Sequence, residues 1–460
     1  MSENQYIDYA RTHDEKAATE RLRRARRVLY AYFFVTGTVI AVWATRVPAV
    51  KDQAGVSAGE LSIALLALAS GALMAMRLSG GLLDRFGGRV VVPPAALAAS
   101  LALSVPAHVS GMLQLTAALF LLGSTHALLN VSVNVQATQL QRAYGRPIIA
   151  SFHAACSFGG CFGAIAGTIF ARAGMDATTT FHVVSIALAA IAITLRKELS
   201  DNAPVPPPLQ RAAPTGRRTW RISAPPSRIA LLGGIALCCM LAEGAATDWS
   251  ALYTREVVGG TEAMASATFA VYTGLMTVGR LVGDRLTLAI GPVAVTRCCG
   301  LLASAGLFLA LVSPVQGVVM LGFGLLGAGL SCVMPQVFTA ASAYDPAKSG
   351  RNLCTVSLIG YCGPLVGPVS IGLLAEYVGL TAALTLPAAL LLLIAVGAGA
   401  LRPATGAQTA PERSVSVASG EPSPMDIAVL EPEVSAAGAA KDRGAPRPRE
   451  EVHSSNTIIS

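Results

Sequence analysis

The sequence predicts an all-α membrane protein with 12 transmembrane helices, arranged as two pseudo-symmetric six-helix bundles. Three observations support this fold class: charged residues are scarce, apolar segments follow one another along the chain, and motifs of the first half recur in the second. Only 13% of the 460 residues are charged and 53% are hydrophobic, with a mean hydropathy of +0.57. Because a soluble domain carries about a quarter charged residues, this composition fits a chain surrounded by lipid.

Twelve apolar segments can be counted, and each is long enough to cross a bilayer as a helix. Their approximate limits are 28–47, 61–83, 90–107, 111–134, 148–172, 178–195, 229–252, 263–283, 288–312, 315–342, 352–375 and 380–401. The gaps at 107–111 and 312–315 are short and depend on proline, histidine and serine as helix breakers. Merging the segments beside one gap would give an odd number of spans, which the distribution of charge disfavours.

Lysines and arginines gather in the head of the chain, in its middle and in alternate short connections, as the positive-inside rule requires of cytoplasmic loops. We therefore expect a multi-pass protein of the cell membrane with both termini in the cytoplasm. The predicted parts are a basic N-terminal tail at 1–27, a bundle at 28–195, a basic, proline-rich cytoplasmic linker at 196–228, a second bundle at 229–401 and a disordered cytoplasmic tail at 402–460.

The sequence lacks the patterns that are typical of several other function classes. Nucleic-acid binding is not expected, because the basic residues alternate with apolar stretches instead of forming one basic face. The nine cysteines show no CxxC or Cys/His spacing, so neither a metal site nor a disulfide framework is predicted. A GxxxxGK[ST] phosphate loop is missing as well, and the sequence implies no cofactor.

The two halves repeat each other. The recurring pairs are Asp84-Arg85 and Asp284-Arg285, displaced by 200 residues, Gln136 and Gln336, also displaced by 200, and Gly145-Arg146 and Gly350-Arg351, displaced by 205. Duplicated six-span halves are a transporter architecture, in which the binding site lies between the halves near the middle of the membrane.

The stretch from Gly80 to Arg89, with the sequence GGLLDRFGGR, resembles the loop signature that major facilitator superfamily transporters carry between their second and third helices. It departs from the signature at Gly88, where a basic residue is commoner, and the second-half copy at 279–285 is looser. The resemblance implies a conformational, gate-holding role for these residues rather than substrate binding. The residues concerned are Gly80, Asp84, Arg85, Gly87, Arg89, Asp284 and Arg285.

A narrower resemblance lies at 243–253, where EGAATDWSALY is similar to the EGAxxDWSAxY segment of YbjJ-like bacterial permeases. Segments at 43–48, 134–136, 145–147 and 153–159 agree with the same branch, and the similarity covers about residues 28–400. It implies a transport fold and little about the cargo.

Glu243 is the first candidate for transport chemistry, because it lies about fourteen residues into its span and so near the middle of the bilayer. A carboxylate there is costly to keep charged, so protonation could couple proton movement to cargo binding; the alternative is a neutral glutamate that only links helices. Asp248 and Arg46 are expected near the outer ends of their spans. They either form a latch of the outer gate or reach the headgroup water separately.

Weaker candidates are spread over four other spans. His126, Asn130 and Asn134 recur every four residues on one helical face, which suits either a polar cargo or hydrogen bonds between helices. His153 could relay protons or could simply be packed or solvated. Gln336 and Tyr361 are candidate cavity residues of the second half.

Together these features predict a secondary active transporter that moves a small organic solute by alternating access, coupled to protons. Both efflux and uptake of a polar metabolite remain open, and the expected partners are the solute, protons and membrane lipid, with the protein acting as a monomer. The alternative is a receptor or scaffold of the same fold that binds without transporting. An intramembrane enzyme is disfavoured, because the sequence has no HExxH or GxSxG motif.

Overall fold

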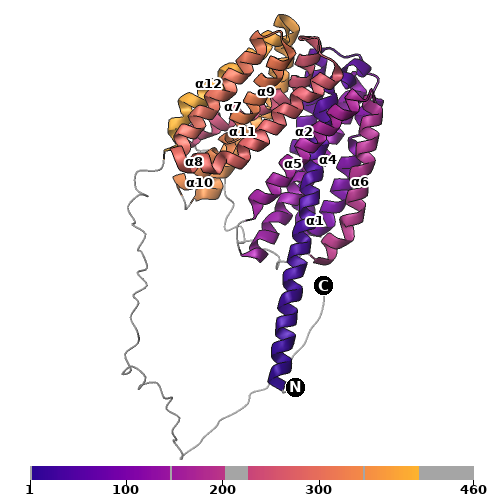
Figure 1. Cartoon of the computed structure of the whole chain (residues 1–460), viewed down its shortest axis with the longest axis vertical. Coiled ribbons are helices and arrows are strands. Elements are labelled where there is room, and N and C mark those ends of the chain that lie inside the picture. The colour runs from indigo at the N-terminus through magenta and orange to yellow at the C-terminus, as the bar shows by residue number, and fades with distance from the viewer. Residues whose placement is uncertain (1–2, 146–147, 203–225, 346–347, 403–460) are drawn as a thin grey trace, which may run out of the picture. The chain divides into compact units, whose positions relative to one another are not determined.

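The structure is a computed structural model that describes residues 3–145, 148–202, 226–345 and 348–402. Within these ranges all regular secondary structure is helical. The first half contains α1 (Glu3–Ala54), α2 (Ala58–Phe86), α3 (Gly88–Ala102), η1 (Val105–His108), α4 (Met112–Tyr144), α5 (Ile149–Arg172) and α6 (Ala177–Asn202). The second contains α7 (Ser227–Glu256), α8 (Glu262–Val312), α9 (Gln316–Leu330), α10 (Val333–Tyr344), α11 (Ser349–Ala383), α12 (Thr385–Gly397) and η3 (Ala398–Leu401) (Figure 1).

The described helices account for all twelve predicted spans. Ten helical segments of the described chain are long and apolar enough to cross a membrane. The ninth of these segments, Gln316–Tyr344, combines α9 and α10. The 51-residue α8 contains two spans, because Gly291 interrupts the helix at φ 81° and ψ 160°. Gly379 interrupts α11 in the same way, and the last span follows it through α12 and η3. The predicted gaps at 107–111 and 312–315 are both present.

Most helices are longer than the apolar segments that predicted them. The first helix begins at Glu3 and runs without interruption into the first span, so the described part of the basic head is helical. The fourth extends ten residues past the predicted limit of 134, because the polar residues there keep their helical propensity outside the apolar core. The predicted linker and C-terminal tail fall largely on 203–225 and 403–460, outside the described residues.

Glycines with positive φ show the duplication directly. Three pairs stand at equivalent connections of the two halves: Gly55 and Gly259, Gly87 and Gly291, and Gly174 and Gly379, separated by 204, 204 and 205 residues. Gly87 (φ 76°, ψ 154°) and Gly291 (φ 81°, ψ 160°) adopt almost the same conformation. Residues other than glycine rarely adopt a positive φ. Both halves therefore use a glycine of the same backbone conformation to turn between consecutive spans.

Small residues let equivalent helices pack closely inside each half. Gly159 in α5 lies against the carbonyl of Phe34 in α1, and a methyl group there would overlap it. Gly363, 204 residues later in α11, lies against the backbone of Leu241 in α7. Close backbone approach of this kind is typical of helix pairs in membranes.

The halves meet through α2 against α11, α5 against α8, and α1 against α7 and α8. Exchanging the halves converts the α2–α11 contact into the α5–α8 contact, since α2 is equivalent to α8 and α5 to α11. The second half thus faces the first across a pseudo-two-fold relation, which confirms the two-bundle prediction.

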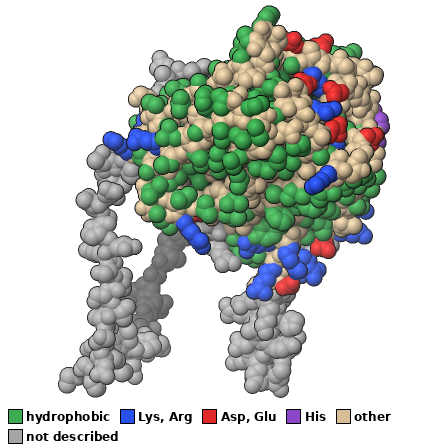
Figure 2. Space-filling model, turned by 45° about the horizontal axis from the view of Figure 1, so that its top comes forward, with side chains coloured by type: hydrophobic (Ala, Val, Ile, Leu, Met, Phe, Trp, Pro, Cys, Tyr) green, Lys and Arg blue, Asp and Glu red, His purple; other side chains and the backbone are tan. Residues whose placement is uncertain are grey.

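The surface matches a lipid environment. Hydrophobic side chains cover most of the face drawn in Figure 2, and Lys, Arg, Asp and Glu gather toward its margins. Many large apolar side chains are exposed on this surface, among them Leu288 at 89% and Leu113 at 83% exposure. A soluble protein rarely exposes so broad an apolar surface, and lipid tails remove its cost.

Candidate functional site

An arginine in α8 connects the two halves in the middle of the structure. Nη1 of Arg280 donates a hydrogen bond to Oγ of Ser157 in α5, at 3.0 Å. Nη2 of Arg280 lies 3.7 Å from Oε1 of Glu243 in α7. Arg280 and Ser157 each lie about four residues, or about 6 Å along the helix, from the centres of their spans. One guanidinium therefore contacts both halves near mid-membrane.

This arginine is accessible rather than sealed in. The side chains of Arg280 and Glu243 are 41% and 39% exposed. Two further predicted residues interact electrostatically with the pair: His153 with Arg280, and Tyr361 with Glu243. Tyr361 is 41% exposed. We call Arg280, Glu243, Ser157, His153 and Tyr361 the Arg280 cluster.

Arg280 is the residue that sequence reasoning missed. In the sequence it stands out only as part of the looser copy of the loop signature. A stronger signal was present, because it is an ionisable group inside the apolar segment 263–283, and such groups are rarely placed in a membrane without a function.

Arg46 forms a latch between the halves, but its partner differs from the predicted one. Its Nη1 lies 2.9 Å from Oε2 of Glu262, in the first turn of α8, and not against Asp248. Its Nη2 donates to Oγ1 of Thr180 at 2.7 Å and to the carbonyl of Met175 at 3.1 Å. The correction has a physical reason: Glu262 is 40% exposed at a helix end, where a carboxylate keeps its charge at less cost than inside a span.

The loop beside this latch carries one more charge. Hydrogen bonds from the side chain and the backbone of Thr179 hold the pKa of the Asp176 carboxyl below its ordinary value. The carboxylate accepts the Thr179 N–H at 2.9 Å, as an N-cap of α6 does. It stays ionised at neutral pH and interacts with the charge of Arg46.

Other contacts join the halves at the same end, where α1 runs into α2 and α7 into α8. Nζ of Lys51 lies 2.6 Å from Oε1 of Glu256. The N–H of Gly59 donates to Oε1 of Glu376 at 2.7 Å. We call this end, with the Arg46 latch, the closed end. In Figure 1 the helices of the two halves converge there, at the top of the view.

The loop-signature residues lie at the opposite end of α2 and α8. Asp84, Arg85, Asp284 and Arg285 are exposed there. Two glutamines support the adjoining turns: a methyl group on Gly88 would overlap Oε1 of Gln136, and Nε2 of Gln336 donates to Oγ1 of Thr287 at 2.7 Å. Gln136 thus lies beside the turn after the first signature, and Gln336 contacts α8 four residues before the equivalent turn at Gly291.

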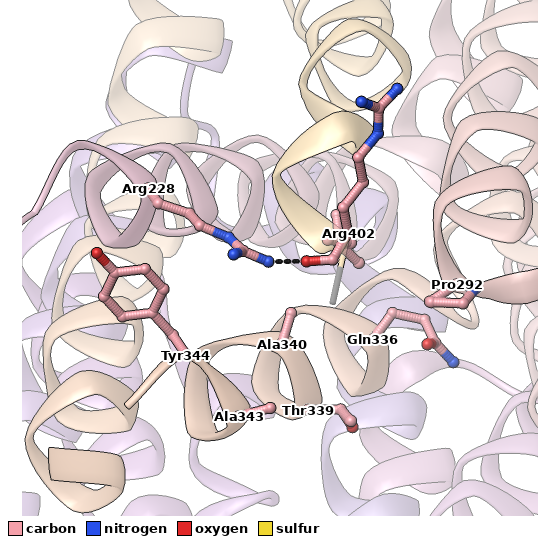
Figure 3. Close-up of a pocket in the computed structure, with 9 residues that line it drawn as sticks. Arg228, Pro292, Gln336, Thr339, Ala340, Ala343, Tyr344 and Arg402 are labelled. Atoms are coloured by element: carbon pink, nitrogen blue, oxygen red, sulfur yellow. Dashed lines mark hydrogen bonds between the residues drawn. The ribbon is translucent and has the colours of Figure 1, made fainter. Parts of the chain in front are cut away.

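Gln336 therefore lies apart from the Arg280 cluster. It lines a cavity of about 130 Å³ with Arg228, Pro292, Tyr344 and Arg402, in which Arg228 donates to the carbonyl of Arg402 (Figure 3). None of the lining residues belongs to the Arg280 cluster. Gln336 thus lines a cavity, as a separate site from the Arg280 cluster, and its amide also contacts Thr287 within α8.

The polar stripe of α4 turns toward its neighbours. Nε2 of His126 lies 3.1 Å from the carbonyl of Thr36 in α1. Nδ2 of Asn134 donates to Oδ1 of Asn130 at 2.7 Å. Among the described residues no hydrogen bond links the stripe to the Arg280 cluster, and the contact of His126 with Thr36 joins α4 to α1. In the ranges that the structure describes, no group of three or more His, Cys, Asp or Glu residues is placed to hold a metal ion.

Comparison with known proteins assigns the family. The model of the major facilitator superfamily matches residues 28–353 and 256–440. The membrane protein MosC of Rhizobium meliloti is 33% identical over 366 residues, covering 79% of this chain and 86% of MosC. The uncharacterized transporter y4wD of Sinorhizobium fredii is 32% identical over 361 residues, covering 77% of this chain and 92% of that protein.

Solved structures agree with the fold. The nucleoside transporter NupG superposes with a TM-score of 0.60 at 13% identity, covering 82% of this chain and 98% of that one. The D-xylose–proton symporter gives a TM-score of 0.64 at 12% identity, covering 82% and 97%. With a duplicated twelve-span fold, the loop signature and relatives along most of its length, this chain belongs to the major facilitator superfamily of transporters.

Proposed function

We propose that the protein is a secondary active transporter that moves a small organic solute across the cytoplasmic membrane by alternating access, coupled to protons. The observation that supports this most is the position of Arg280, which contacts Ser157 of the first half and Glu243 of the second near mid-membrane. In alternating access the two halves rock against each other around a fixed binding site. A polar group that contacts both halves is therefore placed to hold the solute.

The contacts at the two ends supply the gates in this proposal. At the closed end, the pairs Arg46–Glu262 and Lys51–Glu256 break when the halves separate. At the other end, the signature residues Asp84 and Asp284 and their neighbouring arginines form a second gate. This second gate closes when the closed end opens. Both termini then lie in the cytoplasm, on the side of the signature loops, and a single chain is sufficient for transport.

Glu243 is the proton-coupling residue in this proposal. Its carboxyl lies in the middle of α7, about 24 Å from Ser227 and about 20 Å from Glu256 by helical rise. Ionisation is costly at that depth, so the proton occupancy of Glu243 changes the stability of whichever state exposes it. His153 and Tyr361 act beside it, whereas Asp248, Asn130 and Asn134 extend the polar lining of the path.

The test is transport into proteoliposomes that carry an imposed pH gradient, with a panel of metabolites and drugs. We expect wild type to accumulate at least one solute in response to the gradient, and Glu243→Gln to lose that response. The control is Glu20→Gln, which removes a carboxylate whose partner among the described residues is Arg27 of the same helix, α1.

Equal accumulation by wild type and Glu243→Gln would remove Glu243 from coupling. Solute binding without gradient-driven movement, for every compound bound, would favour the receptor alternative instead.

A further inference from the structure

We propose that Arg280 binds an anionic group of the cargo, that Glu243 is the internal anion occupying this arginine when the site is empty, and that the cargo is a hydroxylated organic acid. This inference rests on the proposed transport function and specifies its substrate class. It follows from a comparison of the two arginines that join the halves, Arg46 and Arg280.

Both terminal nitrogens of Arg46 have hydrogen-bonding partners, whereas its buried Nε has none among the described residues. Its side chain is 1% exposed and contacts a carboxylate at 2.9 Å, a hydroxyl at 2.7 Å and a backbone carbonyl at 3.1 Å. These are the lengths expected of charge-assisted hydrogen bonds. Because the side chain is buried and both terminal nitrogens are engaged, Arg46 is closed to a solute and serves as a link between helices.

Arg280 is incompletely paired. Among the described residues its single hydrogen bond is to Ser157, and Glu243 lies at 3.7 Å, beyond hydrogen-bonding length. A guanidinium has five N–H donors and cannot lose its proton in a protein, so most donors of Arg280 remain available while Glu243 balances its charge from 3.7 Å. At 41% exposure it is open to a ligand. A carboxylate is the planar acceptor that fits two parallel N–H groups.

The other groups around the pair favour hydroxyls on the cargo. Ser157 supplies a hydroxyl on the first half and Tyr361 a half-exposed phenol on the second. The titratable groups within electrostatic range of the pair are His153 and Cys156 on α5, Cys239 on α7, Tyr272 on α8, Cys332 between α9 and α10, and Tyr361 on α11. His153 carries the imidazole of this group, a side chain that ordinarily titrates near neutral pH, so a His153 variant belongs in the test.

The exchange conserves charge. In the empty site Glu243 is negative and Arg280 positive, so the pair is neutral. When one proton neutralises Glu243 and one carboxylate of the cargo binds Arg280, the site is neutral again. One proton and one monoanion therefore move together without net charge, so the pH gradient drives transport and the membrane potential does not.

Binding to the full-length protein in lipid nanodiscs tests this inference. The probes are lactate, gluconate and glucuronate, with neutral glucose and cationic glucosamine as controls matched to glucuronate in ring size. We expect an acid to bind with an apparent Kd that rises about tenfold per pH unit where Glu243 is deprotonated, because one proton is taken up with each anion.

Four variants separate the roles. Arg280→Gln should abolish acid binding, and Glu243→Gln should bind with an affinity independent of pH. His153→Gln should keep the pH dependence. Arg77→Gln is the matched control, since Arg77 is an exposed arginine inside the second apolar span and lies outside the Arg280 cluster. Thermal unfolding of each variant checks that it is folded.

Stronger binding of glucosamine or glucose than of glucuronate would overturn the inference. So would binding of none of the three acids, or acid binding that survives Arg280→Gln. Its failure is distinguishable from that of the proposed function: Glu243-dependent accumulation of a neutral or cationic solute would leave transport intact and contradict only the anion site.

Discussion

Two arginines inside apolar spans perform different tasks because their partners differ. Arg46 is surrounded by three acceptors and excluded from solvent, so it holds helices together. Arg280 has one hydrogen bond and a distant carboxylate, so it can exchange partners. The number and length of the contacts, rather than the residue type, distinguish a latch from a binding group.

Loss of the Arg46 latch should favour the opposite conformation. We expect Arg46→Gln to shift the equilibrium away from the closed-end contact by about 1 kcal/mol, or about fivefold, because Glu262 is 40% exposed and partly compensated by solvent. The measurement is reaction of an impermeant thiol reagent with Ser266→Cys, since Ser266 is buried at this end and donates to the carbonyl of Thr45 at 3.0 Å.

The matched control for the latch is Glu20→Gln, which breaks an ion pair of similar type, Arg27–Glu20, within a single helix. Labelling of Ser266→Cys should be unchanged by it. Equal labelling rates with and without Arg46→Gln would show that the latch does not contribute to the equilibrium.

Among the helices, α1 packs closely against α5, and α7 against α11, in the equivalent places of the two halves. Glycines 204 residues apart let both pairs come into backbone contact. Prolines 364 and 368 lie beside the glycines of α11 and remove backbone donors there, which makes this helix a place to bend.

A single methyl group should disturb this packing. We expect Gly159→Ala in α5 to destabilise the protein by about 1–3 kcal/mol, because the new Cβ would overlap the carbonyl of Phe34, a backbone atom that cannot move aside. Gly363→Ala should act similarly against α7. Thermal unfolding in detergent measures both effects.

Gly274→Ala in α8 is the control for these substitutions, because nothing lies within 4 Å of its added methyl group. It should leave the unfolding temperature unchanged or raise it slightly, since alanine favours helix. A loss as large as that of Gly159→Ala would contradict the close-packing explanation.

For the molecule as a whole, the arrangement implies a fixed orientation in the membrane. By the positive-inside rule we expect the basic head, the linker and the signature loops on the cytoplasmic side and the closed end on the other. In intact cells, with the nine native cysteines replaced, Ser110→Cys at the α3–α4 connection should react with an impermeant maleimide. Ser2→Cys and Ser460→Cys should react only after the cells are opened. Reaction of the two terminal cysteines on opposite sides would contradict an even number of spans.

Much of the fold follows from local properties of the chain. Twelve apolar stretches, the recurrence of Asp84-Arg85 at 284–285 and the glycine-rich loop identify the spans, the duplication and the family, because hydropathy and motif spacing do not depend on distant residues. Glu243 could be singled out for the same reason, as a charge within an apolar run.

The pairings between spans could not be obtained in this way. Arg280 meets Ser157 across 123 residues, and Arg46 meets Glu262 across 216. Both depend on the rotation and tilt of helices, which the packing of glycines 159 and 363 and the contact between halves establish. A shift of one residue turns a side chain by about 100° around its helix. For that reason the partner of Arg46, the place of Gln336 and the position of Arg280 between the halves depend on the folded arrangement, whereas the number of spans follows from the sequence alone.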